Sequence, residues 1–412
     1  MKALFWLAIP LMTLHISLSA QQLGRSASRA NYHASADIPD KPAVKWQFKT
    51  NGKVISSPVI NGSHLFIGST DSCMYALDRT TGTQRWKFKT NGAVNSSVAC
   101  DSSAIYFLSE DGFLYAVDMN TGQRRWSFKT GGEHATDPWD YFLSSAAINK
   151  GVVYVGSTDG HIYAINARTG KLQWKFRTGG AVHAAPTVAK DIILAGSFDG
   201  FFYALNPNGS LRWKFNTIGE RFFPVGAVQF HAVVADTCVY FCARDYNVYS
   251  LDLRTGVGFW VYHEPGSWSC VPSLAGERLL VSTSDSYRAL SFDALYGNLQ
   301  WKSPVHLNVF SSIASTNAYG YMGSLDGKLL KMDLRTGEGV TLFQTAASAK
   351  EEHRFFNPDT KALFPDLMAR YKDDYIKMYA DFLDMGSILS TPWLEEGVLY
   401  FGSTDGNVYA LQ

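Results

Sequence analysis

The stretch Gly68-Ser69-Thr70-Asp71-Ser72-Cys73-Met74-Tyr75-Ala76-Leu77-Asp78, continued by Thr81-Gly82 and Trp86, decides the fold because its pattern recurs along the chain. The tryptophan that ends each copy gives the period, with successive intervals of 40, 40, 48, 39, 47 and 41 residues. Self-similarity at such a period is typical of repeat architectures. The tryptophans are Trp46, Trp86, Trp126, Trp174, Trp213, Trp260 and Trp301, and Thr341 takes the eighth position.

Each unit is expected to form four short strands, which in the first unit cover residues 54–60, 64–68, 74–77 and 85–90. The Asp71-Ser72 pair, usually Asp-Gly in the other units, indicates a hairpin turn with positive φ. The Asp78 side chain is placed to bond the backbone of the next turn, which ends at Gly82. Four strands in each of eight units predict an all-β protein with an eight-bladed β-propeller of antiparallel blades.

The two ends of the chain complement each other. Residues 44–48 form an extra fourth strand before the first unit, and the last unit stops at Gln412 without one. We therefore expect the N-terminal strand to complete the last blade, which closes the ring and removes two exposed sheet edges.

These repeats resemble the PQQ-type repeat of eight-bladed quinoprotein propellers over residues 42–412. The resemblance implies the propeller fold but leaves the function open. The same blade occurs in alcohol dehydrogenases that bind pyrroloquinoline quinone and in non-enzymatic scaffolds such as the outer-membrane assembly lipoprotein BamB.

Residues 1–20 have the pattern of a signal peptide, with Lys2, an apolar run and small residues before a cleavage site near Ala20. An uncleaved membrane anchor is the alternative. No Cys follows the apolar run, which departs from BamB, where such a Cys takes the lipid. We expect a periplasmic or secreted protein without a transmembrane span in the mature chain. The polar leader, residues 21–41, is expected to lie across the propeller or to be disordered.

The charge is nearly balanced, with 37 Lys and Arg against 36 Asp and Glu, which argues against nucleic acid or an anionic membrane surface as the main partner. The five Cys are expected to be buried small hydrophobic residues. Cys238 and Cys242 would lie roughly 13 Å apart on one strand, too far for a disulfide. We expect a monomer.

Several units depart from the repeat, and the departures fall between the fourth strand of one blade and the first strand of the next. Residues 131–142 and 219–231 are long connections. Residues 346–385 form a larger insertion, in which the apolar spacing predicts a helix over 366–384 and a shorter one over 348–355. We expect the apolar stripe of the long helix to pack on the propeller, with a partner groove as the alternative.

All these connections should lie on one face of the propeller, because they share that face with the turn between the second and third strands. Loops on a rigid scaffold are where binding residues concentrate. The residues predicted to bind a partner or ligand there are Trp139, Tyr141, Arg221, Phe222, Arg244 and Trp268.

No catalytic constellation is present in the sequence. A quinone cofactor needs an aromatic ring to stack on, cations for its carboxylates and usually a calcium ion. The loop face offers Trp268 or Trp139 and Arg221 or Arg244, but the chain lacks the adjacent Cys pair of many quinoprotein dehydrogenases and is much shorter. The repeated Trp is predicted to pack blades together. The histidines His134, His231 and His263 lack metal-ligand spacing, and we predict turn roles for Asp71, Asp111, Asp159, Asp199, Asp245, Asp285, Asp326 and Asp405.

The sequence thus favours a non-enzymatic exported scaffold that binds a protein or envelope component without a cofactor, with a role like that of BamB in outer-membrane assembly as the best-known analogue. The alternative is a quinoprotein oxidoreductase or sensor that binds pyrroloquinoline quinone with calcium. A third hypothesis is a carbohydrate or other small ligand at the mouth of the central channel.

Overall fold

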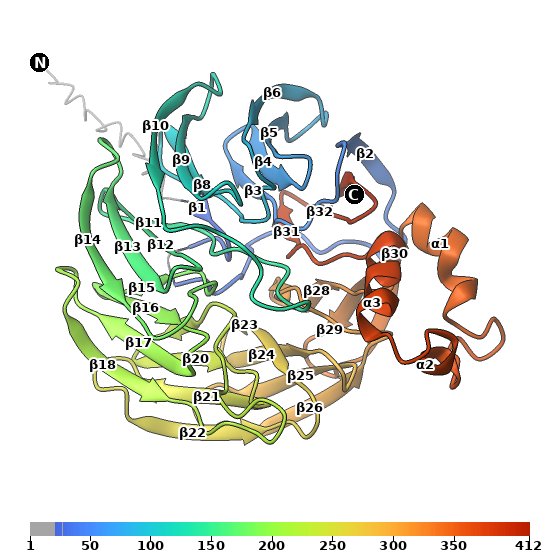
Figure 1. The fold of residues 1–412 in the computed structure, drawn as a ribbon. Coiled ribbons are helices and arrows are strands. Elements are labelled where there is room, and N and C mark those ends of the chain that lie inside the picture. Colours follow the sequence, from blue (N-terminus) through green and yellow to red (C-terminus); the bar gives the residue numbers. More distant parts are fainter. Residues whose placement is uncertain (1–20, 27) are drawn as a thin grey trace, which may run out of the picture.

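In the computed structural model, which describes residues 21–26 and 28–412, eight antiparallel sheets stand in a ring around a common axis (Figure 1). The blades of the first half are β3 (Val59–Asn61), β4 (His64–Ser69), β5 (Cys73–Asp78) and β6 (Gln84–Lys89); β7 (Ala99–Cys100), β8 (Ala104–Leu108), β9 (Phe113–Asp118) and β10 (Arg124–Lys129); β11 (Ala147–Asn149), β12 (Val152–Gly156), β13 (His161–Asn166) and β14 (Leu172–Arg177); and β15 (Thr187–Ala189), β16 (Ile192–Gly196), β17 (Phe201–Leu205) and β18 (Leu211–Asn216). The predicted eight-bladed propeller is confirmed.

The second half of the ring repeats this order of strands from the axis outward. Its blades are β19 (Val233–Ala235), β20 (Cys238–Cys242), β21 (Asn247–Asp252) and β22 (Gly258–His263); β23 (Ser269–Ala275), β24 (Arg278–Thr283), β25 (Arg288–Asp293) and β26 (Leu299–Pro304); β27 (Ala314–Ser315), β28 (Tyr319–Gly323), β29 (Lys328–Asp333) and β30 (Gly339–Gln344); and β31 (Trp393–Glu395), β32 (Val398–Gly402) and β33 (Asn407–Leu411) with β2 (Val44–Lys49).

The chain's first propeller strand closes the ring, as expected. Strand β2 pairs antiparallel with β33, so that Val44 lies opposite Leu411 and Trp46 opposite Ala410. Figure 1 shows the C-terminus beside β2. The last blade therefore joins the two ends of the chain and leaves no missing outer strand.

The repeated tryptophans join neighbouring blades, which confirms their predicted packing role. Trp46 of the last blade lies over Gly82 of the first, and its indole N–H donates to the carbonyl of Arg79 at 3.0 Å. A Cβ on Gly82, whose φ is +73°, would lie 2.6 Å from the Trp46 ring, so only glycine fits this contact. The same arrangement joins Trp86 to Gly122, Trp126 to Gly170, Trp174 to Gly209, Trp213 to Gly256, Trp260 to Gly297 and Trp301 to Gly337.

The innermost strands are shorter than expected. Residues 54–58 were predicted as part of the first strand, but β3 begins at Val59. The preceding segment lies near the axis, where a backbone amide of one blade donates a hydrogen bond to a serine hydroxyl of the next blade. For example, Ser97 Oγ accepts from the amide of Ser57 at 2.8 Å, and Ser57 Oγ accepts from the amide of Thr391 at 2.8 Å. These bonds replace strand pairing at the centre of the ring.

The predicted turn role is confirmed most clearly for six of the eight repeated aspartates, each of which also bonds a tyrosine. In the first blade the Asp71 carboxylate accepts from the amide of Cys73 at 3.0 Å and from the hydroxyl of Tyr75 at 2.6 Å. The matching Asp–Tyr pairs are Asp111–Tyr115, Asp159–Tyr163, Asp199–Tyr203, Asp245–Tyr249 and Asp405–Tyr409.

Asp285 and Asp326 lack the tyrosine, because the residue four positions later is Ala289 in one case and Leu330 in the other. Asp326 still bonds within its own turn, where Ser324 Oγ donates to Oδ1 and Lys328 Nζ lies 3.1 Å from Oδ2. The prediction was wrong for Asp285, whose carboxylate also accepts from Asn308, outside its turn.

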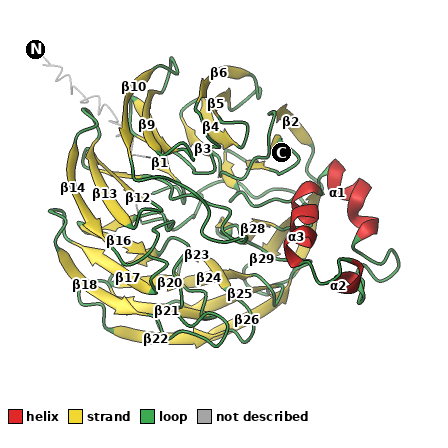
Figure 2. Cartoon of the chain, in the orientation of Figure 1, coloured by secondary structure: helices red, strands yellow, loops and turns green. Residues whose placement is uncertain are grey.

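The insertion is helical and packs on the propeller, but its long helix is broken. It contains α1 (Ala346–Glu351), a 3₁₀ turn (Glu352–Arg354), α2 (Leu367–Arg370) and α3 (Tyr375–Asp384) (Figure 2). The single helix expected over 366–384 was wrong, because Lys372 and Asp373 adopt left-handed φ values of 53° and 61°. Asp374 then caps α3 by accepting from the amide of Lys377 at 2.9 Å.

The leader lies on the propeller, the first of the two alternatives. Its β1 (Gln21–Gln22) pairs with β7 as a fifth strand of the second blade. Arg29 is fully buried and donates to the carbonyls of Pro186 at 2.9 Å and Leu23 at 3.0 Å. Burial lowers the pKa of Arg29 to about 9.

Two further expectations concern the cysteines and the membrane. All five Cys are buried and free, as predicted. Among the described residues, no helix has both the length and the apolar composition of a membrane span. The predicted signal peptide, residues 1–20, lies outside the described residues.

Candidate functional site

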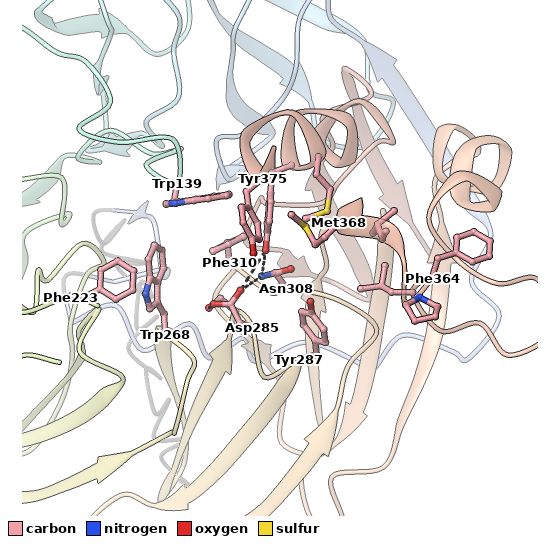
Figure 3. A pocket seen from close by; sticks show the side chains of 16 residues that line it. Trp139, Phe223, Trp268, Asp285, Tyr287, Asn308, Phe310, Phe364, Met368 and Tyr375 are labelled. Carbon is pink, nitrogen blue, oxygen red and sulfur yellow. Dashed lines mark hydrogen bonds between the residues drawn. The ribbon is translucent and has the colours of Figure 1, made fainter. Parts of the chain in front are cut away.

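The connections predicted to share one face of the propeller enclose a cavity of about 410 Å³ there (Figure 3). One wall comes from the long connections and the blade that follows them, with Trp139, Phe223 and Trp268. The facing wall comes from the insertion, with Met368, Tyr375 and Tyr379. Half of the residues that line the cavity are aromatic.

Two of the six predicted site residues line this cavity. Trp139 meets Tyr379 of α3 edge to face, with ring centroids 4.5 Å apart. Trp268 meets Phe223 edge to face at 5.0 Å. Tyr141 lies behind this wall against Phe310, with centroids 5.6 Å apart, and burial raises the pKa of its hydroxyl. The aromatic rings thus join segments far apart in the sequence.

Arg244 supports Trp268 but does not line the cavity. Its guanidinium carbon lies 4.4 Å from the centroid of the Trp268 ring. The guanidinium also pairs with Asp137 and donates to Gln229 Oε1 at 2.8 and 3.0 Å. Because Asp137 balances its charge, Arg244 acts here as a structural cation–π partner and not as a free cation for a ligand.

Arg221 and Phe222 lie outside the cavity. The Phe222 side chain is 70% exposed, and Arg221 lies against it, 5.5 Å from the ring centroid. The neighbouring Phe223, which was not predicted, takes the place in the cavity wall. Alternation along one loop decides which of two adjacent phenylalanines points inward, and the sequence does not show this.

Asp285 and Asn308 line the cavity, but neither was predicted from the sequence to be a site residue. Asn308 Nδ2 donates to Asp285 Oδ1 at 3.3 Å and to the Tyr379 hydroxyl at 3.2 Å, and Ser284 Oγ donates to Asp285 Oδ2 at 2.8 Å (Figure 3). Asn308 is 1% exposed. The sequence contained one indication of this site. The tyrosine that bonds the turn carboxylate in six other blades is replaced by Ala289 in this blade, so no such tyrosine holds Asp285.

A buried polar network holds the loop that carries Trp139. His183 Nδ1 lies 2.7 Å from Asp140 Oδ2, both side chains are fully buried, and Thr158 Oγ1 lies 2.6 Å from His183 Nε2. Burial raises the pKa of Asp140, but hydrogen bonds from His183 and Thr136 outweigh it, so that this pKa lies below its ordinary value. The network fixes the chain on either side of Trp139.

The other titratable residues of the described chain form no cluster suited to a metal ion. His231 is buried near the axis, where desolvation lowers its pKa. Across residues 21–26 and 28–412, no group of three His, Cys, Asp or Glu side chains is arranged to hold a metal ion.

The central channel encloses a second cavity of only about 40 Å³. Phe142, Phe230, Phe310 and Leu389 are among the side chains that line it. This volume accommodates a few water molecules, so it lends no support to the hypothesis of a ligand at the channel mouth.

Solved structures share this fold. BamB from Moraxella catarrhalis is 16% identical, with 90% of this chain and 99% of that chain covered and a TM-score of 0.67. Quinohemoprotein alcohol dehydrogenase from Comamonas testosteroni is 13% identical, with 95% and 80% covered and a TM-score of 0.71. A europium-containing methanol dehydrogenase is 14% identical, with 97% and 99% covered and a TM-score of 0.66. At these identities the likeness shows the fold alone.

Family relationships are clearer at the level of the repeats. A comparison with curated proteins gives no match. The family profile described as "Outer membrane protein assembly factor BamB" matches residues 39–148, 139–264 and 230–355, which together span more than half of the chain. This chain, in which Trp–Gly contacts join neighbouring blades at seven of the eight junctions of the described ring, therefore belongs to the BamB-like family of PQQ-repeat propellers.

Proposed function

We propose that this protein is an exported, non-enzymatic scaffold that binds a protein or envelope component through the face that carries the cavity. We define the partner face as residues 131–142, 217–231 and 346–385. The family supports a role like that of BamB in the assembly of outer-membrane proteins. Export rests on the signal-peptide pattern of residues 1–20.

The observation that carries this proposal is the apolar surface around the cavity. Phe222 is 70% exposed, Tyr375 55% and Ile376 59%. Phe222 extends from a loop, and Tyr375 and Ile376 from the first turn of α3, on a rigid ring of blades. Large exposed apolar side chains at such places are typical of interaction sites. Aromatic residues at the centre of a surface patch are the usual anchors of protein interfaces.

The residues of the cavity do not fit a quinone with calcium. Its lining in the described part of the chain includes one carboxylate, that of Asp285, and no Lys or Arg. The carboxylates of the quinone would lack cations, and calcium would lack the several oxygen ligands that it requires. Arg244, the nearest predicted cation, is already paired with Asp137.

The quinoprotein hypothesis remains the second candidate, because the fold is shared with a quinohemoprotein alcohol dehydrogenase and Trp268 and Asp285 line one cavity. Titration of the purified protein with pyrroloquinoline quinone and Ca²⁺ separates the two hypotheses. The scaffold proposal predicts no saturable change in absorbance and no thermal shift, and a Ca²⁺-dependent change would overturn it.

The scaffold proposal itself is tested by affinity purification from crosslinked cell envelopes. The double variant Phe222→Glu/Tyr375→Glu places charges on the partner face. Leu172→Glu is the matched control, since Leu172 is 43% exposed on β14, next to a turn at the opposite face. We expect the double variant to lose a co-purifying protein that the wild type and the control retain. Identical protein profiles for all three, with each variant folded, contradict the proposal.

A further inference from the structure

Among the described residues, Asp285 is the one charged residue that lines the cavity. No ion pair reaches its carboxylate from any of the residues that the structure describes. In six other blades the equivalent carboxylate is held by its own turn and a tyrosine. In the remaining blade Asp326 lacks the tyrosine but pairs with Lys328. Among the eight equivalents in the described chain, Asp285 alone has neither the tyrosine nor a cation as partner. A carboxylate freed in this way has acceptor capacity for a ligand.

Aromatic rings frame this carboxylate. Trp139, Trp268 and Tyr287 stand around Asp285 in Figure 3, and the Tyr379 hydroxyl lies 3.5 Å from Asp285 Oδ1. The faces of aromatic rings attract cations, most strongly those of tryptophan. Arg244 lies beside Trp268, but its charge is balanced by Asp137. The charge that the cavity presents is therefore negative.

A neighbouring acceptor makes the chemistry more specific. Asn308 Oδ1 is buried and has no hydrogen-bond partner within the described chain, although Nδ2 of the same amide bonds Asp285 and Tyr379. An unpaired buried acceptor is unfavourable unless a donor reaches it. A cation that bears N–H groups would serve Asp285 and Asn308 together.

We propose that the cavity binds a lysine side chain of the partner, with its ammonium group between Asp285 and Asn308. An ammonium group brings three donors on a flexible chain. The planar guanidinium of arginine prefers a carboxylate with both oxygens free, whereas both oxygens of Asp285 already accept hydrogen bonds.

The opposite part of the cavity selects what lies beside the lysine. Leu363, Phe364 and Met368 of the insertion are apolar and line this part of the cavity. Alkyl chains pack favourably on such surfaces, as the stem of lysine does elsewhere. We therefore expect an apolar residue next to the lysine in the partner's sequence.

The test uses small probes of matched length: n-pentylammonium, pentyltrimethylammonium and 1-pentanol, together with N-acetyl-L-lysine methylamide. Binding is measured by ligand-observed NMR and calorimetry on the full purified chain. Pentylammonium and the lysine derivative should bind saturably and more weakly at high salt. Pentanol and the trimethyl probe should each bind roughly tenfold more weakly than pentylammonium, because one lacks the charge and the other the N–H donors.

Asp285→Asn is the diagnostic variant, since it keeps the shape and removes the charge. It should weaken pentylammonium roughly tenfold. Asp373→Asn removes the same charge from an exposed position of the insertion that does not line the cavity, and should change binding less than about twofold. Trp139→Leu, which weakens binding by removing a ring, serves as a second variant if Asp285→Asn does not fold.

Four results overturn the inference: equal affinity for pentanol, equal affinity in Asp285→Asn, tighter binding of the trimethyl probe, or binding of free pentylammonium without the lysine derivative. The last would identify a free amine and not a partner's side chain as the ligand.

The inference that the lysine belongs to a partner protein rests on the proposed function. Different results would contradict the lysine site and the scaffold function. If the protein retains an envelope partner but does not bind the probes, the lysine site is contradicted and the scaffold function is not. If the probes bind in a manner that depends on Asp285 but no envelope partner co-purifies, the scaffold function is contradicted and the cation site is not.

Discussion

Helix α3 forms one wall of the cavity, and Phe382 holds it on the propeller. This side chain is 2% exposed, and its ring centroid lies 4.6 Å from Phe355 and 5.7 Å from Tyr379. The cluster around it includes Phe310 and Leu389 of the propeller. Replacement by Ala at such a site costs about 3–5 kcal/mol, since it removes a buried ring and leaves a cavity.

The substitution should weaken the packing of the insertion on the propeller by this free energy and should leave the stability of the ring of blades unchanged. The blades pair strand to strand without α3, and local units of a protein open separately when few contacts cross between them. A loss of about 3 kcal/mol corresponds to roughly a hundredfold larger open population. Phe382→Ala should therefore speed amide hydrogen exchange in α3 by roughly a hundredfold or more, while exchange in β13 of the third blade stays unchanged.

Ile376→Ala on the same helix is the matched control, because Ile376 is 59% exposed. Surface substitutions of this kind usually stay within about 0.5 kcal/mol, so α3 should exchange at about the wild-type rate. Unchanged exchange of α3 in Phe382→Ala, or equal acceleration in α3 and β13, would refute a separately docked insertion.

Other predictions follow from the blades and the thiols. Gly209→Ala should lower the free energy of unfolding in urea by about 2 kcal/mol or more, because φ is +83° and the new Cβ would lie 2.6 Å from Trp174. Gly62→Ala is the control, since Gly62 has a positive φ but open space around it, and it should cost only about 1 kcal/mol. Equal losses in the two variants would count against the contact between Trp174 and Gly209. Hydrogen bonds, the strongest from Arg85 and others from Thr80 and Thr81, lower the pKa of Asp78 from 3.8 to about 2. The stability that this shift contributes is present above pH 3.8 and lost as the pH falls toward 2. In Arg85→Met, NMR titration should show the Asp78 pKa rising, and an unchanged value would exclude Arg85 as a cause. The five buried thiols should react with a thiol reagent only after denaturation, and rapid labelling of the native protein would contradict their burial.

The ring could be predicted because its determinants are local and repeated. The Asp turn, the Thr-Gly turn and the Trp recur with one spacing, and each acts within its own blade or on the next one. The missing fourth strand after Tyr409 predicted the pairing of β2 with β33 in the same way. A pattern that occurs eight times averages out the exceptions in single blades.

The site could be predicted only in part, because its contacts connect segments without a repeat. The rule for loop connections placed Trp139, Trp268 and the helical insertion together on one face, where they line one cavity. The break before α3 depends on left-handed Lys372 and Asp373, which helical spacing does not reveal. Asp285 resembled its seven equivalents, and only the absence of a tyrosine at Ala289 distinguished it from the turn carboxylates.

The most direct test of the partner face is photocrosslinking in intact cells. A photoreactive amino acid is placed at Phe222, at Tyr375 or at Leu172, which are 70%, 55% and 43% exposed. The proposed function predicts that Phe222 and Tyr375 crosslink to the same envelope protein and that Leu172 does not. Crosslinks to that protein from Leu172 alone, or equally from all three positions, would contradict binding through the face that carries the cavity.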